Sequence, residues 1–110
     1  MIQISSHRPL ELKAFYSDVV GLEIDENVGG FKVGSGFIVI DSHDDVSGPN
    51  DQPARFLVNL FVDDIASEQA RLVAAGVPMI RDRGKEFWGA TISTFIDPDG
   101  NYFQLIEFRP

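Results

Sequence analysis

The sequence predicts an α+β fold made of two modules, each with the element order strand, helix and three strands. Three observations lead to this prediction. Apolar strand-like runs and one helical segment follow the same order in both halves of the chain. The glycines that end the predicted helices, Gly21 and Gly76, occupy matching places, as do the runs 37–41 and 103–107. The chain closes with a ribbon, residues 88–108, that has the pattern of a β-hairpin.

The first module covers about residues 1–42. Residues 1–6 form a short predicted strand, and a helix then runs from Pro9 to Gly21, since proline favours the first helical turn and glycine the end. Phe15 and Val19 are predicted on the inner face of this helix. Three strands follow at 22–28, 31–33 and 37–41, separated by glycine-containing turns.

A polar connection, residues 43–54, leads to the second module, residues 55–110, and we expect both modules to form one domain. The run 56–62 predicts a strand. Asp63 or Asp64 can cap a helix that continues to about residue 75. Residues 77–80 predict a further strand, and 81–87 are predicted to be an inserted loop.

The turn of the final ribbon is the segment 97–101, with the sequence Asp-Pro-Asp-Gly-Asn. These residue types preset or tolerate the dihedral angles of a tight turn, so the flanking apolar runs are predicted to pair as antiparallel strands.

Composition excludes several classes of function. The chain has 110 residues, no cysteine and a formal net charge of −8. Disulfides and thiolate metal sites are therefore impossible, and nine dispersed Lys and Arg residues give no basic footprint for nucleic acid. No apolar run is long enough to span a membrane, and the N-terminal residues lack a secretory signal pattern. We expect a cytoplasmic protein with neither nucleic acid nor membrane as a partner.

Three motifs together resemble the vicinal oxygen chelate superfamily, also called the glyoxalase, bleomycin-resistance and extradiol-dioxygenase fold. They are the helix end from Phe15 to Leu22, the pair Trp88-Gly89 and the turn 97–101. The resemblance covers essentially the whole chain. It implies two curved mixed sheets that each form half of a cup, and a homodimer as the usual assembly of single chains of this length.

The resemblance also implies where metal ligands would lie, on inward-facing positions of the first and last strand of each module. In the second module these positions fall at Leu57 and Gln104. Ile38 is the predicted repeat equivalent of Gln104, and the remaining position falls at Met1 or Ile2, or at Gln3 if the register slips. Only Gln104 clearly offers a donor, whereas zinc, iron or nickel needs three or more His or carboxylate ligands. We therefore predict no metal and no other cofactor.

The two histidines, His7 and His43, fall outside these positions, in predicted loops. The group His43, Asp44 and Asp45 could at most form a weak adventitious site. No Gly-x-Ser-x-Gly elbow and no phosphate-binding glycine loop is present, and the pairs Asp44-Asp45 and Asp63-Asp64 are explained by hydration and helix capping. No catalytic residue is assigned.

Strand alternation places Tyr102, Gln104 and Ile106 on one face and Phe103, Leu105 and Glu107 on the other. The resemblance implies that the face with Tyr102, Gln104 and Ile106 is the interior of the cup. It adds Ile40 to the wall and puts Trp88 at the rim. The predicted ligand-binding residues are Trp88, Gln104, Asn59, Tyr102, Phe61, Leu57 and Ile38. Apolar residues at strand spacing are also typical of an ordinary core.

Three functions follow as hypotheses. The first is a non-catalytic protein, similar to bleomycin-resistance proteins, that binds a small, partly aromatic or cationic molecule in a metal-free cup. The second is a metal-dependent lyase, isomerase or dioxygenase of the same superfamily whose ligands lie elsewhere, so whether the chain is an enzyme stays open. The third is a structural or regulatory dimer without a ligand.

Overall fold

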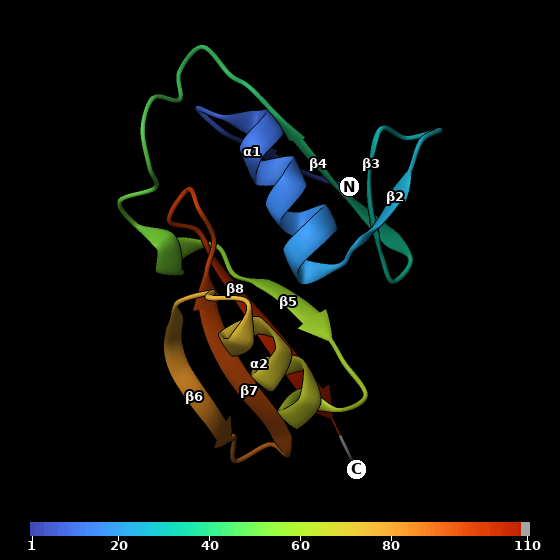
Figure 1. The fold of residues 1–110 in the computed structure, drawn as a ribbon, viewed down its shortest axis with the longest axis vertical. Helices are drawn as coiled ribbons and strands as arrows, with labels where there is room; N and C mark the ends of the chain where they lie inside the picture. Colours follow the sequence, from blue (N-terminus) through green and yellow to red (C-terminus); the bar gives the residue numbers. More distant parts are fainter. Residues whose placement is uncertain (109–110) are drawn as a thin grey trace. The chain divides into compact units, whose positions relative to one another are not determined.

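The computed structural model describes residues 1–108, which form two compact units (Figure 1). The first unit extends from Met1 to Asn50, and the second begins at Asp51. The division falls within the predicted polar connection, residues 43–54.

The first unit contains one four-stranded sheet, here called sheet A. Its strands are β1 (Ile2–Ser5), β2 (Glu23–Asp25), β3 (Gly30–Val33) and β4 (Gly36–Asp41), and they lie in the order β1-β4-β3-β2. β1 runs parallel to β4, while β2, β3 and β4 are joined as antiparallel neighbours. The predicted strand 22–28 is shorter in the structure, where β2 covers only Glu23–Asp25.

One continuous helical segment connects β1 with β2. It begins as the α-helix α1 (Pro9–Ala14) and continues as a π-helical segment, η1 (Phe15–Val20). Gly21 then ends it with φ +88°, a left-handed conformation that glycine adopts without steric cost. The start at Pro9 and the end at Gly21 are confirmed.

The buried face of this helical segment differs from the prediction. Leu12, Tyr16 and Val20 are its buried residues, whereas Phe15 and Val19 are only half-buried. The prediction of Phe15 and Val19 as the inner pair was wrong. The buried residues follow a spacing of four, which brings Tyr16 rather than Phe15 into the core.

The second unit repeats this order of elements. After a short 3-10 helix, η2 (Pro53–Arg55), the chain forms β5 (Val58–Phe61), α2 (Ile65–Ala74), β6 (Met79–Lys85), β7 (Ala90–Ile96) and β8 (Tyr102–Phe108). Its sheet, here called sheet B, has the order β5-β8-β7-β6, with β5 parallel to β8. The two modules of strand, helix and three strands are confirmed.

Local chemistry fixes both ends of α2. The carboxylate of Asp64 accepts a hydrogen bond from the backbone N–H of Ser67, the typical contact of an N-cap residue. Gly76 follows the helix with φ +84°. The predicted cap and terminus of this helix are confirmed.

The final hairpin is also confirmed. Asp97 organises its turn, since Oδ1 accepts from the backbone N–H groups of Asp99 and Asn101, both at 2.9 Å. Its other oxygen, Oδ2, accepts from the Asn101 side chain at 3.0 Å. β7 and β8 then pair from Ile96↔Tyr102 to Ala90↔Phe108.

β6 is the main departure from the predicted elements. The segment 81–87 was predicted to be a loop, but β6 continues through Lys85 as an edge strand with two register irregularities. Its charged sequence gives no apolar alternation that would reveal a strand. Charges and bulges are common on edge strands, where they discourage pairing with another chain.

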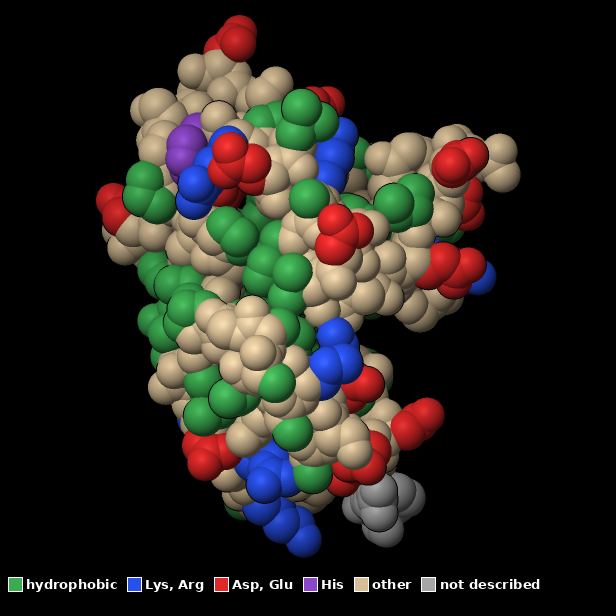
Figure 2. Space-filling model, in the orientation of Figure 1, with side chains coloured by type: hydrophobic (Ala, Val, Ile, Leu, Met, Phe, Trp, Pro, Cys, Tyr) green, Lys and Arg blue, Asp and Glu red, His purple; other side chains and the backbone are tan. Residues whose placement is uncertain are grey.

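Aromatic side chains form the centre of the second unit's core. Phe95 and Phe103 are fully buried and stack with a centroid separation of 5.8 Å. At the surface, Asp and Glu side chains are distributed over the face shown in Figure 2. Among residues 1–108, no helix combines the length and apolar character needed to cross a membrane.

Candidate functional site

The two faces of sheet B have different partners. Phe103 and Leu105 are buried on the face that α2 covers, where Glu107 accepts a hydrogen bond from the first residue of α2, Ile65. Tyr102, Gln104 and Ile106 alternate with these residues and point to the other side, here called the helix-free face. The predicted division of β8 into two faces is confirmed.

A row of polar side chains crosses the helix-free face. Asn59 of β5 pairs with Gln104 of β8, and Gln104 pairs on its other side with Thr94 of β7. The side-chain amide of Gln104 donates to the Thr94 hydroxyl at 2.9 Å. Neither the Gln104 carbonyl oxygen nor the Asn59 amide has a further partner within residues 1–108. Both amides can therefore bind an incoming molecule.

Arg81 extends this polar row onto β6, where it pairs with Thr94. Its guanidinium forms an ion pair with Glu86 at 2.7 Å. The guanidinium also occupies the space over Gly84, because a Cβ added there would lie 2.5 Å from Arg81 Nη2. The row thus ends in a paired positive and negative charge.

Apolar side chains lie on both sides of the polar row. On one side, Ile92, Ile106 and Phe61 are consecutive cross-strand partners, and Ile92 and Ile106 are buried together with Ala90. On the other side lie Tyr102 and, two residues before Asn59, Leu57. Phe61 is 75% exposed and Leu57 43% exposed, so both present apolar area to solvent.

Trp88 lies beside the end of β8. Its indole stacks on Phe108 with a centroid separation of 6.5 Å and an interplanar angle of 23°. Phe108 has the same alternation as Gln104, so this aromatic pair borders the helix-free face. Gly89 follows Trp88 in the chain and lies against the Phe108 ring. Its φ of +106° is a backbone conformation that favours glycine. Both aromatic side chains are half exposed.

Six of the seven predicted ligand-binding residues therefore belong to the second unit, at or beside the helix-free face. The seventh, Ile38, was placed wrongly. It lies in sheet A, 6% exposed, on the same side of β4 as Ile40, which faces α1. The predicted repeat was out of register by one residue, and such a slip moves a side chain to the opposite face. Val39, not Ile38, corresponds to Gln104, since Gln3 pairs with Val39 as Asn59 pairs with Gln104.

Two residues of the polar row were missed by sequence reasoning. Thr94 lies in a predicted strand, but its role depends on its partner Gln104 across the hairpin. Arg81 was assigned to a loop, so no strand alternation was applied to it. The hairpin register counted outward from the turn would have placed Thr94 opposite Gln104.

The histidines lie outside this site. His7 and His43 are both exposed, and the His43 Nδ1 accepts a hydrogen bond from the backbone N–H of Asp45. Within residues 1–108 no group of three or more His, Cys, Asp or Glu side chains could hold a metal ion.

Each module has a mixed sheet, a covering helix, and a first strand parallel to the last. Two such modules in one chain define a class of α+β proteins built from a repeated module. The chain matches the family model of the Glyoxalase/Bleomycin resistance protein/Dioxygenase superfamily over residues 3–105. The chain therefore belongs to this superfamily, the vicinal oxygen chelate superfamily.

Solved structures agree on the fold. A family enzyme from Burkholderia phytofirmans PsJN matches with a TM-score of 0.77 at 20% identity, covering 98% of this chain and 96% of that one. A putative glyoxalase family protein from Bacillus anthracis matches with 0.73 at 22% identity, covering 98% and 90%. TioX from Micromonospora sp. ML1 matches with 0.70 at 15% identity, covering 100% and 95%. Comparison with curated proteins found no match.

The donor set at the superfamily's metal positions does not fit a divalent metal ion. On sheet B, Leu57 is aliphatic and Gln104 offers a single neutral amide oxygen, while its amide nitrogen donates to Thr94. On sheet A, the equivalent of Gln104 is Val39, which has no donor atom in its side chain. Since such ions need three or more His or carboxylate ligands, no chemical step is assigned to a metal here.

Proposed function

We propose that the helix-free face of sheet B binds a small, partly aromatic molecule without the help of a protein-bound metal. The observation that carries the proposal is the polar row of Asn59, Gln104 and Thr94 between two apolar rows. Small-molecule sites typically combine mostly apolar walls with a few polar groups that fix orientation.

Each part of the face has a distinct role in this proposal. The aromatic rings of Phe61 and Tyr102 offer stacking area, and the Trp88–Phe108 pair offers more at the border. The Asn59 amide, the Gln104 carbonyl oxygen and the second N–H of the Gln104 amide can donate and accept, so they suit a ligand with amide or hydroxyl groups. Because Thr94 holds the Gln104 amide, this residue is oriented before the ligand arrives.

A positive charge on the ligand would add to its attraction. The formal net charge of −8 raises the local concentration of small cations around the protein. This contribution is long-range, so it should weaken as ionic strength rises, whereas the stacking contribution should persist.

The experiment uses three probes: bleomycin, suggested by the family description, and the matched pair benzamidine and benzamide. Binding is followed by Trp88 fluorescence and by calorimetry. We expect Asn59→Leu and Gln104→Leu each to weaken binding about fivefold to tenfold, the worth of one or two hydrogen bonds. Gln69→Leu is the matched control, because it removes an amide that bonds to Asp82, away from the helix-free face.

Two results would overturn the proposal. One is the absence of binding by all three probes to the folded protein. The other is binding that both Asn59→Leu and Gln104→Leu leave unchanged. A preference for benzamidine over benzamide that disappears at high salt would support the additional attraction of cations.

A further inference from the structure

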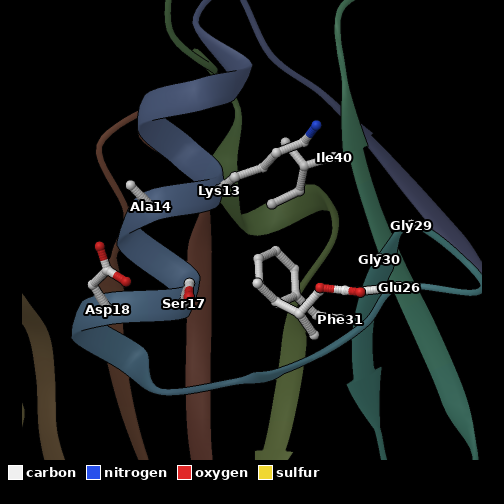
Figure 3. Close-up of a pocket in the computed structure, with 10 residues that line it drawn as sticks. Lys13, Ala14, Ser17, Asp18, Glu26, Gly29, Gly30, Phe31 and Ile40 are labelled. Carbon is white, nitrogen blue, oxygen red and sulfur yellow. The ribbon is translucent and has the colours of Figure 1, made fainter.

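The first unit contains a cavity that is separate from the helix-free face of sheet B. It lies between the helical segment α1–η1 and the hairpin β2–β3 and has a volume of about 460 Å³ (Figure 3). Pockets that hold small ligands typically have volumes of about 300–1,000 Å³. The residues that line it are Lys13, Ala14, Ser17, Asp18, Ile24, Glu26, Gly29, Gly30, Phe31 and Ile40.

The floor of the cavity is apolar. Phe31 and Ile40 are 3% and 2% exposed, and Figure 3 shows both side chains between the strands and the helix. Gly29 and Gly30 form part of the wall. Because they have no side chains, the backbone itself borders the cavity there. A residue larger than glycine would not fit at position 30, because its Cβ would lie 2.6 Å from the carbonyl oxygen of Ile38. An apolar or aromatic group of a ligand can therefore contact this floor.

The rim carries opposite charges on opposite sides. Lys13 extends from the helix toward Ile40, and the carboxylate of Glu26, on the β2–β3 turn, lies beside the Phe31 ring (Figure 3). Ser17 lies on the strand-facing side of the helix, whereas Asp18 points away from Phe31. Ser17 belongs to the π-helical segment, a departure from α-helical geometry that is frequent at functional sites.

These rim groups are unpaired within residues 1–108. Lys13, Ser17 and Glu26 form no ion pair or side-chain hydrogen bond there, although Arg8 pairs with Glu11 and Arg71 with Glu68. Lys13 is half-buried, so part of its surface is already removed from water before any partner is present. A ligand with both an acidic and a basic group could pair with both sides of the rim.

We propose that this cavity binds a small amphoteric molecule, with an acidic group at Lys13, an amino group at Glu26 and an apolar or aromatic body against Phe31. The opposite signs of the rim charges select against a simple anion or cation, because each would meet one like charge. The hydroxyl of Ser17 adds a donor and acceptor beside the bound molecule. This second site is independent of the function proposed for sheet B.

The test follows backbone amide resonances of isotope-labelled protein during titration with 4-(aminomethyl)benzoate. We expect shifts at Ser17, Gly29, Gly30 and Phe31 rather than on sheet B. Benzylamine and 4-methylbenzoate, which each keep one charge, should bind about threefold to fivefold more weakly, since a partly exposed ion pair contributes modestly.

Matched variants distinguish the effect of the rim charges on binding from the effect of the protein's overall charge. Lys13→Gln and Glu26→Gln should each weaken binding of 4-(aminomethyl)benzoate about threefold to fivefold. Lys32→Gln and Glu23→Gln remove one charge of each sign from the hairpin β2–β3, at exposed cross-strand partners outside the cavity, and should change binding little. The proposal is overturned if no cavity amide shifts, if the singly charged probes bind equally well, or if the two pairs of variants behave alike. Shifts confined to sheet B would likewise overturn it.

Discussion

Phe95 and Phe103 are the residues on which the interior of the second unit most depends. Both side chains are fully buried, and their rings stack at 5.8 Å. Replacing a buried phenylalanine by alanine removes apolar burial and leaves a cavity, so we expect Phe103→Ala to lower the free energy of unfolding by about 3–5 kcal/mol. Chemical denaturation measures this change.

Phe87→Ala provides the control for that prediction. The Phe87 side chain is 99% exposed, so its removal should change the free energy of unfolding by less than about 0.5 kcal/mol. Equal effects of the two substitutions would contradict the assignment of the core.

Asp82 gives a prediction about pH. The side-chain amide of Gln69 donates to its carboxylate at 2.7 Å, and this bond, with the Arg83 backbone N–H, holds the pKa of Asp82 below its usual value of 3.8. A lowered pKa in the folded state stabilises the fold above pH 3.8, and that contribution is lost as the pH falls through the folded-state pKa. Gln69→Leu should therefore raise the pKa of Asp82, as measured by carboxyl NMR titration. Identical titration curves for the two proteins would refute the assigned cause.

Among the secondary-structure elements, the hairpin β3–β4 depends on the close approach of Gly30 to the neighbouring strand. A Cβ at position 30 would lie 2.6 Å from the Ile38 carbonyl oxygen and 2.9 Å from a methyl group of Val39. Because the first of these atoms belongs to the backbone, it cannot move aside by rotation. We expect Gly30→Ala to lower the free energy of unfolding by about 1–3 kcal/mol.

Gly36→Ala is the matched comparison in the same hairpin. Its added Cβ would lie 3.7 Å from the Val33 carbonyl oxygen, an ordinary contact, and its φ is not positive. We expect a change of less than about 0.5 kcal/mol, because the strand accepts the extra methyl group without rearrangement. A larger loss of stability for Gly36→Ala than for Gly30→Ala would contradict the described register.

The sequence could predict those elements whose boundaries have local chemical signals. Pro9, Gly21, Asp64 and Gly76 marked the helices, and the turn 97–101 marked the last hairpin. β6 has no such signal, since a charged edge strand shows no apolar alternation and obtains its order from pairing with β7. Tertiary pairing also decides register, which is why Ile38 was placed on the wrong face.

For the whole molecule, the candidate site was predictable only on sheet B. Alternation along β5 and along β8, with the two strands related by the superfamily resemblance, was enough to place Asn59, Phe61 and Gln104 on one face. The polar row also needed the pairing of β7 with β6, which sequence spacing did not reveal, whereas the register of β7 against β8 could have been counted from the hairpin turn. The cavity of the first unit lies between the helical segment α1–η1 and the hairpin β2–β3 that follows it in the chain, and it depends on how these elements pack, which no local pattern indicated.

We also expect the chain to associate as a homodimer, because large apolar side chains remain exposed at or next to β1 and β5, which are edge strands of their sheets. Phe56, next to β5, is 83% exposed, and Ile2 in β1 is 60% exposed. Sedimentation equilibrium should give a dimer, and Phe56→Glu should weaken it at least about tenfold by placing a charge in a desolvated contact. Leu10→Glu, on α1, is the control. A monomer at every concentration would contradict this expectation.

Binding of a small aromatic molecule to the helix-free face of sheet B can be followed at the two amide side chains of the polar row. The most direct measurement is the change in the side-chain amide resonances of Asn59 and Gln104 on saturation with benzamidine. We expect both resonances to shift together with backbone amides of β5 and β8, and the shifts of β8 to be lost in Gln104→Leu. Saturation that leaves both side-chain amides unchanged, or shifts confined to other elements, would contradict binding at this face.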